Sequence, residues 1–138
     1  MANSTTLYTG SDGRVQVDVT ENKTLTLADC GIVQNVITDA ITVTLPATAA
    51  GTTFTIRNGG VPASSSVGMG TGSDFSCLVT ISPQAADKIQ GYALTAADDK
   101  DLLNTKATAK VGDEVVLVGD GVDGYNIQRI KGTWARQA

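Results

Sequence analysis

The sequence predicts an all-β protein: a single-domain antiparallel β-sandwich or barrel, jelly-roll-like, with at most one short helix. The 138 residues include 19 Thr and 14 Val but only two Glu. β-Branched side chains suit a pleated, half-buried surface and lose rotamer freedom in a helix. Fifteen Gly supply turns, and short alternating runs recur between them at a spacing typical of sandwiches and barrels. The length is that of one domain.

The first residues differ from the rest in pattern. Residues 1–12 are polar and unpatterned, which predicts a flexible N-terminal arm ahead of a β-sandwich domain over 13–138. Strict alternation follows in residues 15–19, whose three valines are expected to point inward. A short strand is expected over 24–27, and the Gly-containing stretch 28–31 is expected to turn the chain.

Three further candidate strands follow. Residues 32–37 and 41–45 are expected to pair with each other about a turn at 38–40. Pro46 ends the second run because proline cannot donate a hydrogen bond to a β-ladder. Residues 53–57 alternate again and predict the next strand.

The longest low-complexity stretch is the loop of residues 58–75, rich in Gly and Ser. Loops of this length are uncommon inside compact domains and are often functional or mobile. Two interpretations remain open: a disordered surface loop, or a contact loop that orders on binding a partner. In the second, the contact candidates are Pro62, Val67 and Met69. A strand over 77–81 follows.

The one candidate helix covers residues 94–104, with Thr95 as N-cap and Asp98 at the third helical position. Either it forms one or two helical turns or the segment is a loop.

A hairpin closes the chain. In residues 113–130, two β-branched and aliphatic runs flank a Gly/Asp tract, the pattern of two antiparallel strands and a turn. Trp134 is expected to cap the core or to lie in a subunit interface. The side chains expected to pack the two strands are Val115, Leu117, Tyr125 and Ile127.

Residues of the types that usually carry out catalysis are scarce. The chain has no His, which removes the usual general base and most catalytic triads. Carboxylates cluster near residues 98–101, and Asp120 and Asp123 lie in the hairpin turn, where Asp commonly bonds the backbone. The Asp/Gly tract lacks the spacing of a calcium loop. We therefore predict no catalytic residue, no metal site, no cofactor and no enzyme activity.

The net charge, the lack of apolar spans and the cysteine content narrow the classes of function that remain. The net charge is −4, which disfavours a nucleic-acid surface, because phosphate binding needs clustered Lys and Arg. No apolar run approaches a membrane span, and the N-terminus lacks a Sec signal, which predicts synthesis in a cytoplasm. Cys30 and Cys77 have no metal-ligand spacing and are expected to be reduced and buried or half-buried, with a disulfide as the alternative.

Several stretches together resemble the small β-rich virion proteins of tailed bacteriophages, especially capsid decoration (cement) proteins. They are Leu25–Gly31 (LTLADCG), Ile41–Pro46 (ITVTLP), Gly51–Ile56 (GTTFTI) and the ending from Asn104 through Tyr125-Asn-Ile to Gly132-Thr-Trp-Ala135. The resemblance covers roughly residues 13–135.

The resemblance implies a structural role. It implies a homotrimer that binds the major capsid protein on the outer capsid surface of a virion and stabilises the shell at capsomer junctions. The arm is the first candidate for the capsid contact, and the loop of residues 58–75 is the second. The arm's contact candidates are Ala2, Asn3, Ser4, Thr5, Thr6, Leu7 and Tyr8.

The alternative is a tail-fibre or spike module that binds host glycan. Its candidate surface is the Gly/Ser loop together with exposed aromatics, for which the sequence offers Tyr92, Tyr125 and Trp134.

Overall fold

The computed structural model describes residues 3–61, 75–105 and 107–138, which form twelve β-strands and one short 3-10 helix, η1. The strands are β1 (Tyr8–Thr9), β2 (Val15–Val19), β3 (Lys23–Thr24), β4 (Val33–Val36), β5 (Ile41–Thr44), β6 (Thr53–Asn58), β7 (Val79–Ser82), β8 (Lys88–Gln90), β9 (Leu102–Asn104), β10 (Glu114–Gly119), β11 (Gly124–Lys131) and β12 (Ala135–Arg136), and η1 covers Leu27–Asp29. Within the described ranges, no helix has the length and apolar character that a membrane span requires.

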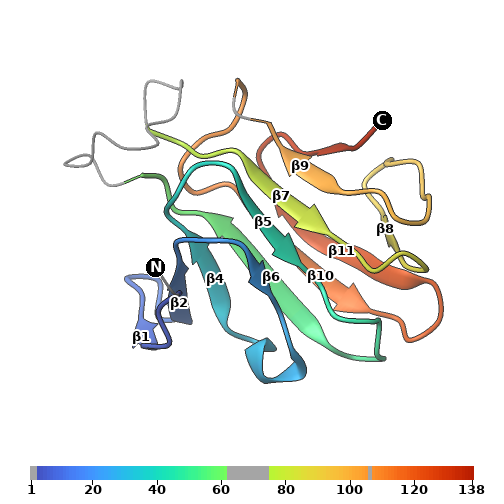
Figure 1. The fold of residues 1–138 in the computed structure, drawn as a ribbon, viewed down its shortest axis with the longest axis horizontal. Coiled ribbons are helices and arrows are strands. Elements are labelled where there is room, and N and C mark those ends of the chain that lie inside the picture. Colours follow the sequence, from blue (N-terminus) through green and yellow to red (C-terminus); the bar gives the residue numbers. More distant parts are fainter. Residues whose placement is uncertain (1–2, 62–74, 106) are drawn as a thin grey trace.

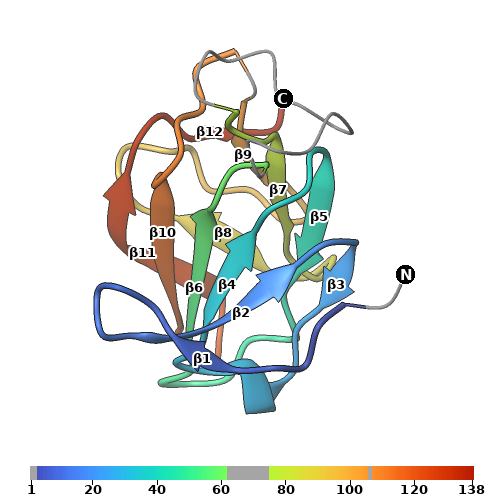
Figure 2. The ribbon, with the colours of Figure 1, turned by 90° about the vertical axis from the view of Figure 1, so that its left-hand side faces the viewer.

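The strands form two sheets that face each other (Figures 1 and 2). Sheet A has the order β1-β2-β4-β6-β10-β11-β8, and sheet B has the order β12-β9-β7-β5-β3. Apolar side chains from both sheets form one core between them. The predicted all-β, single-domain sandwich is confirmed.

The first half of the chain winds as a coil between the two sheets. β2, β4 and β6 lie side by side in sheet A and run parallel, and β3, β5 and β7 do the same in sheet B. The expectation of a purely antiparallel, jelly-roll-like sandwich is therefore wrong, because both sheets are mixed. The expected pairing of residues 32–37 with 41–45 is also wrong, since β4 and β5 lie in opposite sheets.

The second half closes the sheets with mainly antiparallel strands. β10 pairs with β6 and then with β11, which confirms the predicted closing hairpin. β9 pairs with β7 and β12 with β9, both antiparallel. β8 instead runs parallel to β11 and forms the far edge of sheet A.

The predicted helix does not form. Its last residues are β9, and Leu102 and Asn104 point into the sandwich, where both are buried. Asp99 has a positive φ of 56°, which interrupts a right-handed helix. Pairing with β7 therefore outweighs a local capping signal.

The aromatic side chains of the hairpin lie in the core. Tyr125 is fully buried, its ring meets that of Phe54 edge-on at 5.9 Å, and its hydroxyl donates to the carbonyl of Pro46 at 2.7 Å. Burial raises the pKa of Tyr125 to about 12. Trp134 is 8% exposed, and its indole N–H donates to the carbonyl of Lys131. Trp134 therefore caps the core of its own chain, and its expected place in a subunit interface remains untested.

The two cysteines lie at different depths. Cys77 is buried in the core cluster and Cys30 packs against that cluster half-buried. Both residues are described, and they form no disulfide.

Candidate functional site

The N-terminal segment, residues 3–14, lies along the edge of the sandwich. The side-chain oxygen of Asn3 accepts hydrogen bonds from the backbone N–H of Thr20 at 2.7 Å and of Glu21 at 3.0 Å. β1 then pairs antiparallel with β2 and covers the edge of sheet A. The path of residues 3–12 is thus defined by contacts with the domain. Whether the arm is flexible in solution stays a prediction.

A hollow of about 260 Å³ separates this segment from the body of the domain. Its walls combine apolar, hydroxyl and charged side chains. The lining residues are Asn3, Ser4, Thr5, Leu7, Val17, Lys23 and Asp29. Lys23 is held in place there, because its ammonium donates to Gln34 at 2.7 Å. We call this the N-terminal hollow.

Four large apolar side chains in the first 27 residues are exposed, and one of them, Leu7, lines the N-terminal hollow. Leu7 is 51% exposed, Tyr8 39% and Val15 42%. Leu27, 60% exposed, belongs to η1, the same short helix as the lining residue Asp29. We call these four side chains the N-terminal face.

Val15 departs from the predicted pattern. It was expected to point inward with the other two valines of β2, which are 2% and 0% exposed. Instead it pairs with Thr9 of the edge strand β1 and stays 42% exposed at the start of β2.

Tyr8 is anchored by its hydroxyl. That group donates to the carboxylate of Asp18 and accepts from the amide of Gln16 at 2.7 Å. Burial, followed by the hydrogen bond to Asp18, raises the pKa of Tyr8. The ring therefore belongs to a fixed surface.

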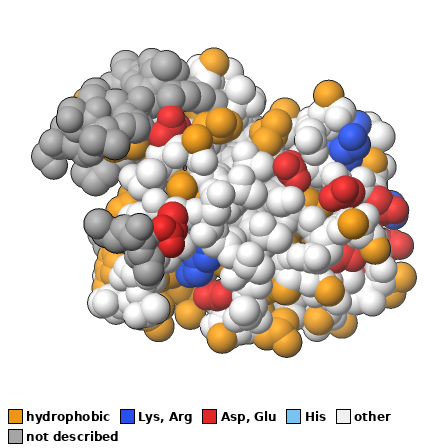
Figure 3. All heavy atoms as spheres, in the orientation of Figure 1, with side chains coloured by type: hydrophobic (Ala, Val, Ile, Leu, Met, Phe, Trp, Pro, Cys, Tyr) orange, Lys and Arg blue, Asp and Glu red, His pale blue; other side chains and the backbone are white. Residues whose placement is uncertain are grey.

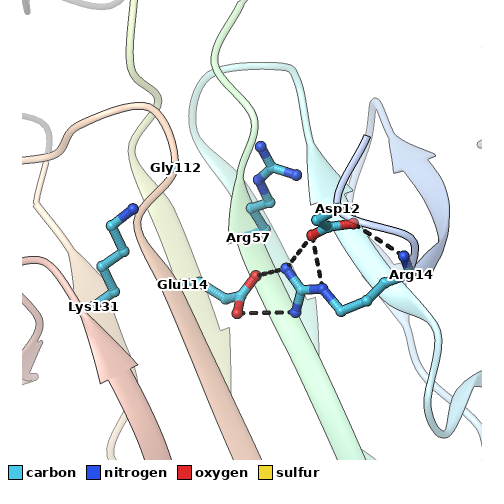
Figure 4. A pocket seen from close by; sticks show the side chains of 6 residues that line it. All are labelled: Asp12, Arg14, Arg57, Gly112, Glu114 and Lys131. Atoms are coloured by element: carbon cyan, nitrogen blue, oxygen red, sulfur yellow. Dashed lines mark hydrogen bonds and ion pairs between the residues drawn. The ribbon is translucent and has the colours of Figure 1, made fainter. Parts of the chain in front are cut away.

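A second hollow, of about 200 Å³, lies on the outer side of sheet A (Figure 4). Its lining residues are Asp12, Arg14, Arg57, Gly112, Glu114 and Lys131. Figure 2 shows the loop after β1 reaching across the sheet toward β10, which brings Arg14 to this place. We call it the charged hollow.

Arg14 joins the two acids of the charged hollow. Its guanidinium donates to both oxygens of Glu114, at 2.6 and 3.0 Å, and to Asp12 at 2.7 Å. The hydrogen bond to Glu114 raises the pKa of Arg14 further above its usual value. The backbone and side-chain hydrogen bonds from Arg14 lower the pKa of Asp12. One cation thus ties the N-terminal segment to β10, across 100 positions of sequence.

Replacing Arg14 with methionine is expected to lower the free energy of unfolding by about 1 kcal/mol. The loss is moderate because Arg57 and Lys131 flank Glu114 in register and offset part of its charge. Urea unfolding of R14M, E114Q and the double variant would measure the coupling. If the effects of the two single changes were strictly additive, the contact between Arg14 and Glu114 would contribute nothing to the free energy of unfolding.

The outer side of sheet B has a different character. Figure 3 views the molecule from this side, and the middle of the surface, over β5, carries no charged side chain. The outward residues there bear hydroxyl groups and lie opposite one another in register: Thr42 beside Thr80, and Thr44 beside Ser82. Acidic side chains gather instead toward the end with β8 and β9.

The carboxylates considered from the sequence serve local structure. One oxygen of Asp120 accepts from the backbone N–H groups of Val122, Asp123 and Gly124 at 2.8–3.0 Å, and these bonds, led by that from Gly124, lower its pKa. Asp98 pairs with Lys88 at 2.8 Å. Among the described residues, no three His, Cys, Asp or Glu side chains are placed to hold a metal ion.

The remaining candidates fall in three groups. Asn3, Ser4, Thr5 and Leu7 line the N-terminal hollow, Tyr8 bonds Gln16 and Asp18, and Thr6 is exposed. Of the three aromatics considered for glycan binding, only Tyr92 is exposed, at 58%. Ala2, Pro62, Val67 and Met69 lie outside the described residues.

The sequence did not reveal the charged hollow. Its members come from the N-terminal segment, β6, the turn before β10, β10 and β11. No motif joins them, and only the register of the strands brings them together.

Comparison with models of known protein families finds no match, and comparison with curated proteins finds none either.

Proposed function

We propose that this protein is a head decoration protein of a tailed bacteriophage. It binds the major capsid protein on the outer surface of the capsid and stabilises the shell at capsomer junctions. The observation that best supports the proposal is the N-terminal face, four apolar side chains exposed within the first 27 residues, of which Leu7 lines the N-terminal hollow. Its role is binding, without a catalytic step.

Burial against a capsid would give this face its binding energy. Each square ångström of apolar surface removed from water contributes roughly 25 cal/mol. A modest contact suffices when it is repeated over the shell and each protomer makes more than one contact.

The resemblance also implies a homotrimer located on the virion. A trimer seated at a three-fold or quasi-three-fold position would contact neighbouring capsomers with three N-terminal faces. Electron microscopy of purified capsids mixed with the protein tests this directly. Three-fold density at capsomer junctions is expected, and single copies scattered over capsomer centres would contradict the proposed arrangement.

Changing Leu7 to aspartate is expected to weaken capsid binding by about 2 kcal/mol, or about thirtyfold, because a carboxylate would be buried in an apolar contact. The matched control is Tyr92→Asp. Tyr92 is also exposed, follows β8 at the opposite edge of sheet A, and has a positive φ of 49° that Asp tolerates. Cosedimentation of each variant with purified capsids measures the affinity.

Equal binding by L7D and wild type would contradict the proposed contact surface. Deleting residues 2–12 is a less clear test, since it also removes β1 and the Asn3 anchors and so uncovers the edge of sheet A. The glycan-binding alternative draws less support from the structure, because Tyr125 and Trp134 are buried and form no exposed platform. Specific binding on a glycan array would favour it.

A further inference from the structure

A row of polar side chains crosses the outer side of sheet A. In register, Asp18 of β2 lies beside Asn35 of β4, which lies beside Arg57 of β6. The row continues through Glu114 of β10 to Lys131 of β11. Adjacent strands are about 4.8 Å apart, so Arg57 and Lys131 stand on either side of Glu114. The charged hollow lies over this end of the row.

Arg14 forms hydrogen bonds with both carboxylates of the charged hollow. It engages both oxygens of Glu114, and Glu114 is only 11% exposed. It also holds Asp12 by a side-chain and a backbone hydrogen bond. Neither acid therefore depends on the remaining two cations for a partner.

Arg57 and Lys131 keep their charged groups available. Within the described residues, neither side chain makes an ion pair or a hydrogen bond. Figure 4 shows both head groups turned toward the Gly112 end of the hollow, away from the contact between Arg14 and Glu114. The Lys131 ammonium lies 3.7 Å from where a side chain at Gly112 would begin. The absence of that side chain leaves space in front of the ammonium.

We propose that the charged hollow binds a carboxylate group on an acidic segment of a protein partner. Arg57 offers a planar fork of donors that matches a carboxylate, and Lys131 offers a second positive charge. The binding groups belong to β6 and β11, so this inference does not depend on the N-terminal face or on capsid binding.

The charge of the hollow favours a singly charged ligand. Three cations and two carboxylates line it, which leaves one positive charge for a carboxylate to neutralise. Phosphate in its doubly charged form would exceed that charge. A volume of about 200 Å³ suits the end of one acidic side chain.

The test is an NMR titration of the full chain with a capped tri-glutamate peptide at constant ionic strength. Saturable shifts are expected at the backbone amides of Gly112, Glu114 and Lys131. The double variant Arg57→Gln with Lys131→Gln should weaken peptide affinity about tenfold or more, because two charge-assisted hydrogen bonds are lost. Inorganic phosphate, titrated separately, should bind more weakly than the peptide.

Arg136→Gln serves as the control, because Arg136 lies on β12 of the other sheet. It should leave peptide affinity unchanged. If the double variant does not fold, Lys131→Gln alone should still weaken binding. The proposal is overturned by the absence of saturable shifts in the wild-type protein, by equal loss in the control, or by unchanged affinity in the Arg57 and Lys131 variants. Phosphate binding as tight as peptide binding would overturn the assignment to a carboxylate.

Discussion

Replacing Asn58 with leucine is expected to lower the free energy of unfolding by about 4 kcal/mol, because several buried groups would lose their hydrogen bonds together. Asn58 is fully buried on the inner side of β6. Its amide donates to the carbonyl of Cys77 at 2.8 Å, and its oxygen accepts from the N–H groups of Cys77 and Gly60. Leucine has a similar size and can replace none of these bonds.

The same side chain links the two sheets. The amide of Asn58 in sheet A also donates to the side-chain oxygen of Asn104 in sheet B, at 2.7 Å. Asn104 in turn donates to the carboxylate of Asp113 and the carbonyl of Thr133. The network therefore continues from the coil of the first half into the closing strands.

Urea unfolding of N58L measures this effect, with Asn126→Leu as the control because Asn126 is exposed on β11. The control is expected to change stability by less than about 0.5 kcal/mol. A cycle of N58L, N104L and the double variant gives the coupling between the sheets. A loss for N58L no larger than that of the control would show that the network does not stabilise the fold.

Changing Gly124 to alanine is expected to cost about 3 kcal/mol and to detach β8, because backbone strain and a steric clash act together. Gly124 has a φ of 146°, and it lies beside Lys88 where β8 runs parallel to β11. A methyl group there would collide with the backbone nitrogen and oxygen of Lys88. Backbone atoms of a paired strand cannot move aside without breaking the ladder.

Gly51→Ala separates the two causes. Gly51 also has a positive φ, 79°, but no atom lies within 4 Å of its missing side chain. It should therefore show only the conformational cost, about 1 kcal/mol. Thermal unfolding compares the two variants, and amide exchange of Ile89 reports whether β8 stays paired. If both variants lost the same stability, the clash with Lys88 would contribute nothing beyond the conformational cost.

The closing hairpin could be predicted because its determinants are local. Alternation marks the inward side of β10, and a Gly/Asp tract joins it to β11. The turn is then held by one oxygen of Asp120 and three backbone N–H groups within four residues. The residues that determine the hairpin therefore all lie within one short stretch of chain.

The parallel coil could not be predicted in the same way. Residues 32–37 and 41–45 are both rich in β-branched residues, and only four residues separate β4 from β5, a pattern that favours a hairpin. In the structure the intervening turn instead carries the chain from one sheet to the other, and Ala40 adopts a positive φ of 60° within it. Alternation shows that a strand has a buried side but does not identify the neighbouring strand.

The two candidate sites differ in the same way: one could be found from a local sequence pattern and the other could not. The sequence identified residues 2–8 as contact candidates because the segment is unpatterned, and four of the six that the structure describes line the N-terminal hollow. The charged hollow went unnoticed, since Arg14, Arg57 and Lys131 acquire a common surface only through strand register.

The sequence alone therefore determined the fold class, the turns and most of the buried side of each strand, since these follow from properties of neighbouring residues. The tertiary structure decided which strands pair, in which direction, and which distant charges meet on sheet A. These depend on contacts between segments up to 100 residues apart. Such contacts do not produce a hydrophobic periodicity in either segment, so the sequence pattern does not reveal them.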